Sequence, residues 1–342
     1  MQITTWRPRW PGGTSAPPTL VGEATDLGPV GDGDVVIAIE AVAVSDRELA
    51  PGADLVPGSA AVGCVIGGGA GALDLVGHRV LIGAHQACGE CEVCRRGGAP
   101  VCRRGRVLGA STDGLLASHT VCRARWLVAF GGELDVPGAA AALLPGDAAL
   151  AYTMYARAGV GPREPTVIVG EGSLARFLVE ILVAKGAPPM VVGGRAFGPW
   201  ADWVLGRGCS YATLEDRPGL DARDDDHQER DREAVRAAAM ERGFGERPWR
   251  VFACDASVAQ QRRALTLAGP RATVTLPPCE GRAGDLGRAA AAALAREVLL
   301  IGVAGPHPDL VPEVTALAVR GELDVATVAE VVAPEALVAA RA

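Results

Sequence analysis

Four cysteines lie within fifteen residues of this 342-residue chain, at Cys88, Cys91, Cys94 and Cys102. Two-residue gaps let consecutive thiolates turn back on one centre, and the loop to Cys102 supplies a fourth corner. Gly89 permits one of the tight turns that such wrapping requires. Four thiolates complete the tetrahedral sphere of Zn²⁺ and leave no position for water or substrate. The spacing therefore predicts a closed, structural zinc site. Unrelated thiols or a disulfide pair are the alternatives.

Composition narrows the classes of partner. Hydrophobic residues make up 49% and charged residues 21%, which indicates a folded globular protein. A formal net charge of -7 argues against nucleic-acid binding, which needs a basic footprint. No apolar run is long enough to span a bilayer, and the first residues lack a signal-peptide pattern. We therefore expect a cytoplasmic protein with a small-molecule substrate and with neither a nucleic-acid nor a membrane partner.

The pattern of apolar residues changes near Pro145. Before it, short apolar runs broken by Gly and Pro predict an all-β unit. After it, strands and helices alternate, which predicts βαβ units and a parallel sheet, hence an α/β fold with a doubly wound domain. The expected strands are 166–169, 190–192, 251–254, 272–276 and 298–302. The expected helices are 148–159, 174–186, 234–242, 258–268 and 312–320.

A glycine-rich turn follows the first of these strands. The sequence from Gly170 to Ala175 reads Gly-x-Gly-x-x-Ala, after a strand and before a helix. In such a turn the first glycine allows the sharp bend, the second admits a pyrophosphate, and the alanine allows close helix packing. The helix N-terminus faces the phosphates. We predict dinucleotide binding by Gly170, Gly172, Ser173 and Leu174.

The next strand ends in Gly193-Gly194-Arg195. Enzymes that prefer NAD usually carry Asp or Glu here, as the acceptor for the ribose 2′-hydroxyl. None is present in this segment. The two glycines leave room, and Arg195 can pair a 2′-phosphate with two hydrogen bonds. These three residues therefore predict NADP(H) as cofactor. The alternative is that Arg195 simply lies in solvent.

The cysteine spacing resembles the structural zinc lobe of the zinc-containing alcohol dehydrogenases, in the medium-chain dehydrogenase/reductase superfamily. Gly77–Val80 and Asp113–Ala117 resemble two further motifs of that family, Gly-Asp-Arg-Val and Asp-Gly-Gly-Phe-Ala. The resemblance implies a GroES-like catalytic domain and a Rossmann cofactor-binding domain. Their expected bounds are 1–146 with 306–342, which includes a zinc lobe at about 85–105, and 147–305. It also implies a homodimer or homotetramer.

Members of that family use a second zinc as a Lewis acid on the substrate oxygen. The resemblance places its three ligand positions at Ala43, at Ser59, and at Pro145 or Gly146. None of these residues is a usual zinc ligand. Ala60 also replaces a glutamate of the family pattern. We therefore expect that the catalytic zinc ligands are lost and that the cysteine lobe holds the one zinc ion.

Without that zinc, hydride transfer needs another proton donor or polarising group. Ser45 stands where the family has its proton-relay Ser or Thr, and Asp46 stands where the family supports the metal ligands. Tyr152, on the helix expected near the nicotinamide, is a candidate acid. Glu48 occupies a position where some relatives have a relay His. The alternatives are a buried hydroxyl bonded to backbone for Ser45 and core packing for Tyr152.

Three functions follow from these residues and the resemblance. The first is an NADP(H)-dependent reductase of an activated C=C, C=N or C=O bond that works without catalytic zinc, in specialised biosynthesis. The second is an ordinary alcohol dehydrogenase or ketone reductase that uses Ser45 or a tyrosine as acid and base. The third is a catalytically silent, nucleotide-binding relative.

Overall fold

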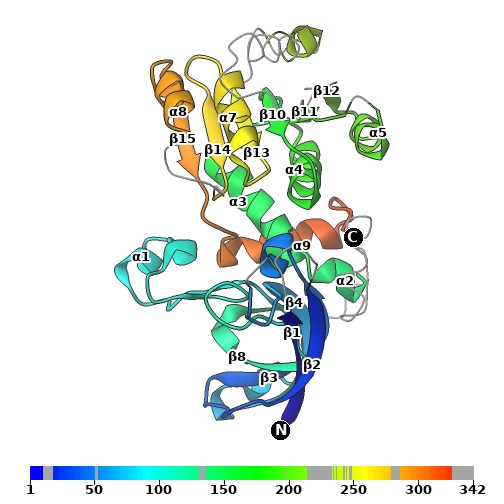
Figure 1. Ribbon diagram of the computed structural model, residues 1–342, viewed down its shortest axis with the longest axis vertical. Helices are drawn as coiled ribbons and strands as arrows, with labels where there is room; N and C mark the ends of the chain where they lie inside the picture. Colours follow the sequence, from blue (N-terminus) through cyan, green and yellow to red (C-terminus); the bar gives the residue numbers. More distant parts are fainter. Residues whose placement is uncertain are drawn as a thin grey trace. The chain divides into compact units, whose positions relative to one another are not determined.

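The computed structural model divides into two compact units, Met1–Ala149 with Pro306–Ala342 and Leu150–Gly305 (Figure 1). The side chains of Asp46, Arg47 and Phe130 lie outside the description. The described residues are 1–10, 18–50, 53–130, 136–195, 197–213, 233, 235, 237–241, 243, 245, 249–278 and 286–325.

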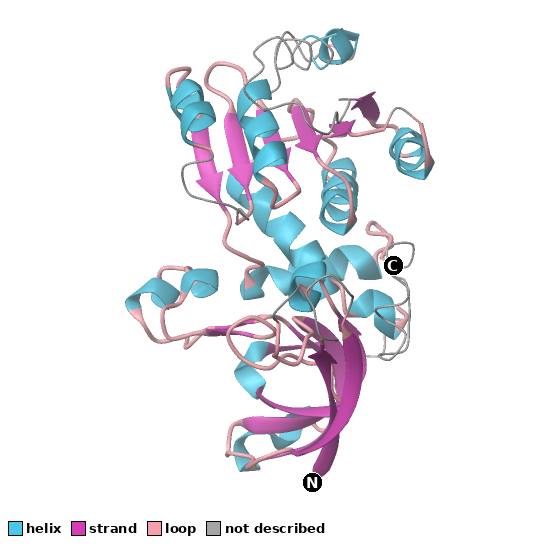
Figure 2. Ribbon diagram, in the orientation of Figure 1, coloured by secondary structure: helices cyan, strands magenta, loops and turns pink. Residues whose placement is uncertain are grey.

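The first unit is built on antiparallel strands, drawn in magenta in Figure 2. A two-stranded ribbon pairs β1 (Gln2–Arg9) with β2 (Thr19–Asp26). A five-stranded sheet has the order β8-β3-β4-β5-β9. Its strands are β3 (Asp34–Ala43), β4 (Ala60–Gly68), β5 (Arg79–Ile82), β8 (His119–Arg123) and β9 (Leu127–Phe130). Fully buried Val35, Ile37 and Ile82 lie in one apolar cluster with Leu115, and burying such side chains stabilises the sheet.

Shorter elements complete the first unit and carry most of the residues of interest. The cysteine lobe runs between β6 (His85–Gln86) and β7 (Arg106–Val107), which pair with each other. Its helical turns are α1 (Glu92–Arg95) and η3 (Ala99–Val101). The helical elements of the first unit outside the lobe are η1 (Asp46–Leu49), η2 (Ala70–Leu75), η4 (Ala124–Trp126), α2 (Gly138–Ala141), η5 (Leu144–Ala148), η6 (Pro308–Leu310) and α9 (Val311–Val319).

The second unit is a parallel six-stranded sheet in the order β12-β11-β10-β13-β14-β15 (Figure 1). The strands are β10 (Thr166–Val169), β11 (Met190–Gly193), β12 (Ser210–Thr213), β13 (Arg250–Ala253), β14 (Thr273–Leu276) and β15 (Leu299–Gly302). The helices are α3 (Ala149–Ala158), α4 (Ser173–Ala184), α5 (Pro199–Gly206), α7 (Val258–Leu267) and α8 (Gly287–Leu294). Strand order reverses between β10 and β13, and such a switch point is where doubly wound folds bind dinucleotides.

The expected α/β fold, a β-domain followed by a Rossmann-like domain, is confirmed. Strand β12 and helices α5 and α8 were not expected from the sequence. Strand β12 buries only alternate residues, so it lacks the continuous apolar run that marks β10 and β11. The expected helix 234–242 falls partly outside the described residues, which are helical at 235 and 237–241. No helix in the described part of the chain is long and apolar enough to cross a membrane.

Candidate functional site

The four lobe cysteines bring their sulfur atoms into one cluster. The Sγ atoms all lie within 4.8 Å of one another. The Cys91–Cys94 and Cys88–Cys102 sulfurs are 3.4 and 3.5 Å apart, and two further pairs are 3.9 Å apart. Tetrahedral Zn–S bonds of about 2.3 Å place sulfurs roughly 3.8 Å apart, so the cluster has the size that zinc needs. All four cysteines are free thiols, which removes the disulfide alternative.

Backbone amides of the lobe lower the pKa of one cysteine in this cluster, which favours the thiolate form that binds a cation. The pKa of Cys88 is lowered to about 6, first by the backbone amide of Glu90 and then by that of Cys91, against the effect of desolvation. Desolvation, followed by the neighbouring thiols, raises the pKa of Cys94 to about 12. A metal ion replaces protons on thiols, so it would remove this mismatch. Within the described residues, no other group of three or more His, Cys, Asp or Glu side chains is close enough for a metal ion.

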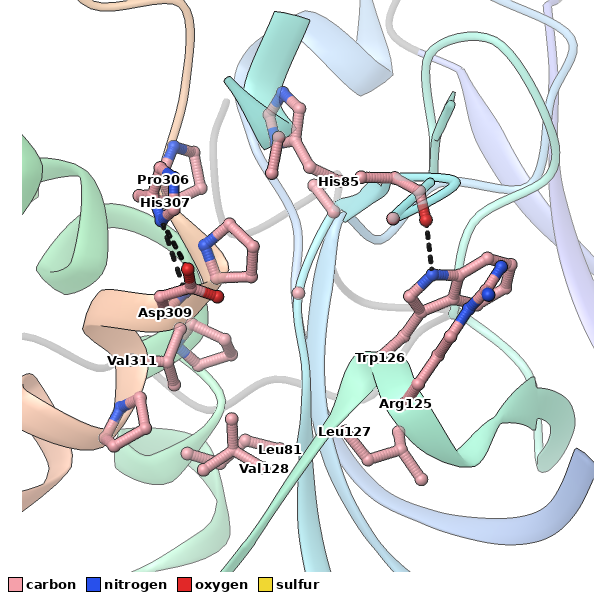
Figure 3. Close-up of a pocket in the computed structure, with 18 of the residues that line it drawn as sticks. Leu81, His85, Arg125, Trp126, Leu127, Val128, Pro306, His307, Asp309 and Val311 are labelled. Atoms are coloured by element: carbon pink, nitrogen blue, oxygen red, sulfur yellow. Dashed lines mark hydrogen bonds and ion pairs between the residues drawn. The ribbon is translucent and has the colours of Figure 1, made fainter. Parts of the chain in front are cut away.

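A pocket of about 440 Å³ lies beside the lobe within the first unit, as Figure 3 shows. Leu81, Val128 and Val311 give it apolar walls. The Nε2 atom of His307 donates to the carbonyl oxygen of Gly97 at 2.7 Å, so the segment before α9 is tied to the lobe. The Nδ1 atom of His85 is buried without a hydrogen-bond partner, and burial lowers the pKa of His85. Sequence reasoning had singled out neither histidine.

The fold also brings together the positions expected to have lost the catalytic zinc ligands. Ala43, the last residue of β3, pairs with Ala60, the first of β4. A Cβ atom added at Gly146 would lie 3.4 Å from the Cβ of Ala60. Ser59 directly precedes Ala60 in the chain. Ala43, Ser59 and Gly146 offer this place methyl, hydroxyl and backbone groups rather than thiols or imidazoles.

Ser45 and Glu48 form a capped turn next to this place. The Ser45 hydroxyl donates to Glu48 Oε2 at 2.8 Å, and the Ser45 backbone N–H donates to the same oxygen at 2.7 Å. The backbone N–H of Gly58 donates to the other oxygen at 2.8 Å. Glu48 is only 8% exposed, whereas Ser45 is exposed. The carboxylate therefore joins η1 to the loop before Ser59. This turn was not predicted from the sequence, although the pattern Ser-x-x-Glu, typical of a capping box, could have indicated it.

Replacing Glu48 with alanine should destabilise the first unit. The change leaves two backbone N–H groups without their acceptor, the buried one of Gly58 and the partly buried one of Ser45. We expect the free energy of unfolding to fall by about 3 kcal/mol. Urea and thermal melts of the full chain measure this. Glu92→Ala is the control, because Glu92 is exposed and, among the described residues, pairs with Arg96 at the end of its own helical turn, so the expected change is below about 0.5 kcal/mol. Equal changes in the two variants would contradict the bridging role.

Tyr152 lies away from the glycine-rich turn of its own unit. Its ring centroid is 5.6 Å from that of Tyr155, and Lys185 Nζ lies 5.7 Å from the Tyr152 ring. Lys185 caps the C-terminal end of α4, whereas Gly172 caps the N-terminal end, about 18 Å away along a twelve-residue helix. This placement favours packing for Tyr152. The side chain of Asp46, the other expected catalytic residue, lies outside the described residues.

The expected cofactor residues meet at the carboxyl ends of β10 and β11. Gly170 and Gly172 have φ values of 124° and 94°, which L side chains rarely adopt, and α4 starts at the next residue. The Gly170 N–H donates to the carbonyl oxygen of Val192 at 3.1 Å. Ser173 and Leu174 open α4, Gly193 ends β11, and Gly194 and exposed Arg195 follow directly after it.

Two residues of this edge were missed by the sequence reasoning. Glu171 Oε1 accepts the Gly194 N–H at 2.9 Å, and the Tyr211 hydroxyl donates to the Arg195 carbonyl oxygen at 2.9 Å. Burial, and then the charge of Glu171, raise the pKa of Tyr211. No sequence signal identified them, because each contact depends on how two separate segments cross the sheet edge.

Residues 31–132 match the alcohol dehydrogenase GroES-like domain. This part of the chain is a GroES-like domain of the alcohol dehydrogenase type. An alcohol dehydrogenase of Geobacillus stearothermophilus is 30% identical over 165 residues, which are 45% of this chain and 48% of that protein. The match spans about half the length of this relative, and it supports a place in the zinc-type alcohol dehydrogenase, or medium-chain dehydrogenase/reductase, superfamily.

Solved structures share the fold along nearly the whole chain. An alcohol dehydrogenase of Escherichia coli CFT073, complexed with NADH, has a TM-score of 0.72 at 17% identity and covers 95% of this chain and 89% of its own. A protein of Sinorhizobium meliloti 1021 bound to NADP has a TM-score of 0.70 at 16% identity, with 95% and 90% covered. At these identities the likeness extends to the fold, and the two neighbours hold different cofactors.

Proposed function

We propose that this chain is an NADP(H)-dependent oxidoreductase that exchanges hydride with an organic small molecule without catalytic zinc. One observation carries the proposal. The place where Ala43, Ala60 and Gly146 meet has no usual metal ligand among them, while the Gly170–Ser173 turn keeps the geometry of a dinucleotide site. The same proposal includes one structural zinc in the cysteine lobe, a cytoplasmic location and a homodimer or homotetramer.

The cofactor part of the proposal rests on the second unit. The turn between β10 and α4 leaves space for a pyrophosphate beside a helix N-terminus. Arg195 is exposed at the end of β11, where its guanidinium can pair a 2′-phosphate. A bound nicotinamide would supply the hydride chemistry. The protein's share is to orient the ring, to hold the substrate and to manage the proton.

For the proton, Ser45 is the residue we propose. Ser45 is exposed, and its hydrogen bond to the buried Glu48 carboxylate fixes the position of its oxygen. For catalysis the Ser45 O–H turns from Glu48 to the substrate and gives its proton to the atom that becomes negative when hydride arrives, and water then reprotonates the serine oxygen. A hydroxyl polarises a carbonyl less than zinc does. Activated acceptors such as conjugated alkenes and iminium ions therefore suit this site better than simple ketones.

The test is a turnover assay with purified protein of measured metal content. NADPH and NADH are each mixed with a panel of enones, imines and ketones, and loss of reduced nicotinamide absorbance is followed. We expect oxidation of NADPH with an activated acceptor. Turnover of simple alcohols or ketones alone would favour the ordinary dehydrogenase. Cofactor binding without oxidation by any acceptor would favour the silent relative and would sink the proposal.

Two substitutions separate the candidate proton donors. Ser45→Ala should lower kcat by about a hundredfold, the usual contribution of a general acid, and leave cofactor affinity intact. Tyr152→Phe should leave kcat unchanged, since the Tyr152 ring packs beside Lys185 at the far end of α4. Steady-state kinetics with the best acceptor, with kcat and KM read separately, measure both. A loss of kcat in Tyr152→Phe but not in Ser45→Ala would assign the role of proton donor to Tyr152 instead.

A further inference from the structure

A carboxylate lies at the end of β11, and it comes from Glu171 in the turn after β10 rather than from β11 itself. Glu171 stands between the two glycines of the Gly170–Gly172 turn, and its Oε1 accepts the Gly194 N–H at 2.9 Å. A Cβ atom added at Gly193 would lie 2.8 Å from the same oxygen. The carboxylate therefore lies directly against the backbone of Gly193 and Gly194. Only a residue without a side chain at Gly193 permits this approach.

Neighbouring groups hold this arrangement in place. A side chain at Gly193 would also overlap the Tyr211 hydroxyl, which donates to the Arg195 carbonyl oxygen at 2.9 Å. Tyr211 lies on β12, the strand beside β11, so the backbone around Arg195 is anchored to the sheet. Glu171 Oε1 and the Tyr211 hydroxyl both lie against the Cα of Gly193, and the negative charge of Glu171 contributes to the raised pKa of Tyr211.

The two cofactors make opposite demands on this edge. The 2′-hydroxyl of NAD(H) can donate a hydrogen bond to a carboxylate. Enzymes that prefer NAD usually place an acidic residue at the end of this strand for that purpose. The 2′-phosphate of NADP(H) is an anion that needs donors and positive charge. The Gly194 N–H is one such donor, but it already donates its hydrogen bond to the Glu171 carboxylate. Arg195 offers positive charge beside it, and its guanidinium has no hydrogen-bond or ion-pair partner among the described residues.

We propose that Glu171 sets the selectivity between NAD(H) and NADP(H), as the acceptor for the ribose 2′-hydroxyl and as the competitor of a 2′-phosphate for the Gly194 N–H. This inference rests on the proposed function, because it concerns the same cofactor site. It replaces the expectation that the β11 edge lacks an acidic group. Glu171 and Arg195 act against each other, so Glu171 weakens the preference for NADP(H) that Arg195 provides, and the ratio of the two affinities moves with either residue.

The experiment is calorimetric titration of the full chain with NADPH and with NADH. Glu171→Gln removes the charge and keeps the size of the side chain. We expect it to raise the preference for NADPH, read as Kd of NADH over Kd of NADPH, by about tenfold, the equivalent of one charge-assisted hydrogen bond. Arg195→Ala should shift the same ratio by about tenfold in the opposite direction.

Glu164→Gln is the matched control. Glu164 also accepts a glycine N–H, that of Gly161, at 2.8 Å, but it precedes β10 and so lies at the other end of that strand. Its ratio should equal that of the wild type. Thermal melts verify that each variant is folded. If Glu171→Gln does not fold, Glu171→Ala is measured in its place. An unchanged ratio in the folded Glu171 variant would overturn the inference. A wild-type chain that binds neither cofactor would instead overturn the proposed function.

Discussion

Cys102→Ser should remove the zinc from this protein and unfold the lobe between β6 and β7. Three thiolates and a hydroxyl bind zinc far more weakly than four thiolates, and structural zinc sites contribute about 10–16 kcal/mol of binding free energy in small peptides. The wild-type chain should carry about one zinc ion, because four thiolates fill one tetrahedral site. Mass spectrometry of the purified chain measures metal content, and hydrogen exchange of residues 88–102 measures the order of the lobe.

Cys64→Ser is the control for this substitution. Cys64 is an exposed free thiol on β4, outside the lobe, so its replacement should leave both zinc content and stability unchanged. Chelators should strip the wild-type metal faster as the pH falls, since protons compete with zinc for thiolates. Retention of zinc by Cys102→Ser would contradict the assignment of this site. Two zinc ions in the wild type would overturn the proposal of chemistry without catalytic zinc.

Gly172→Val should abolish cofactor binding. Gly172 has φ of 94° and ψ of -171°, a backbone conformation that is essentially confined to glycine and costs other residues about 1–3 kcal/mol. A valine side chain at this turn would also stand where the pyrophosphate must approach the backbone. We expect an affinity loss of at least about a hundredfold for either cofactor, since strain and blocked contact act together. Calorimetric titration measures it.

Gly186→Val separates strain from blocked contact. Gly186 has φ of 73° and follows α4 at its C-terminal end, away from the turn. This variant should lose stability for the same backbone reason and keep its cofactor affinity. If both glycine variants lost affinity alike, general destabilisation would explain the result and the turn would not be the binding site.

The parallel sheet could be predicted from the sequence because its central strands are buried on both faces. Thr166–Val169 and Met190–Gly193 are fully buried, so each appears as a continuous apolar or β-branched run bounded by Gly or Pro. Strand β12 is half-buried and α5 is only eight residues long, so neither has a distinct pattern. The cysteine cluster was predictable because its ligands are close in sequence and spaced for one metal.

The contacts that tune the site could not be predicted in the same way. The hydrogen bond between Glu171 and Gly194 joins residues 23 positions apart, and it depends on the direction in which the turn after β10 leaves the sheet. The orientation of Tyr152 depends on the rotation of α3 about its axis, which the two tyrosines of this helix, Tyr152 and Tyr155, do not fix from the sequence. Glu48 is different, because the Ser-x-x-Glu pattern of a capping box could have predicted its turn, although Glu48 was considered only as a relay position.

The hydrogen bond from His307 to Gly97 bears on the order in which the chain completes itself during synthesis. The cysteine ligands span residues 88–102, so the lobe can take up metal soon after these residues leave the ribosome. His307 and α9 are made only after the whole parallel sheet, and α9 contacts η5, where Pro145 and Gly146 lie. Domains generally fold as units during translation. The contact between α9 and η5 can therefore form only after the residues of the second unit have been synthesised.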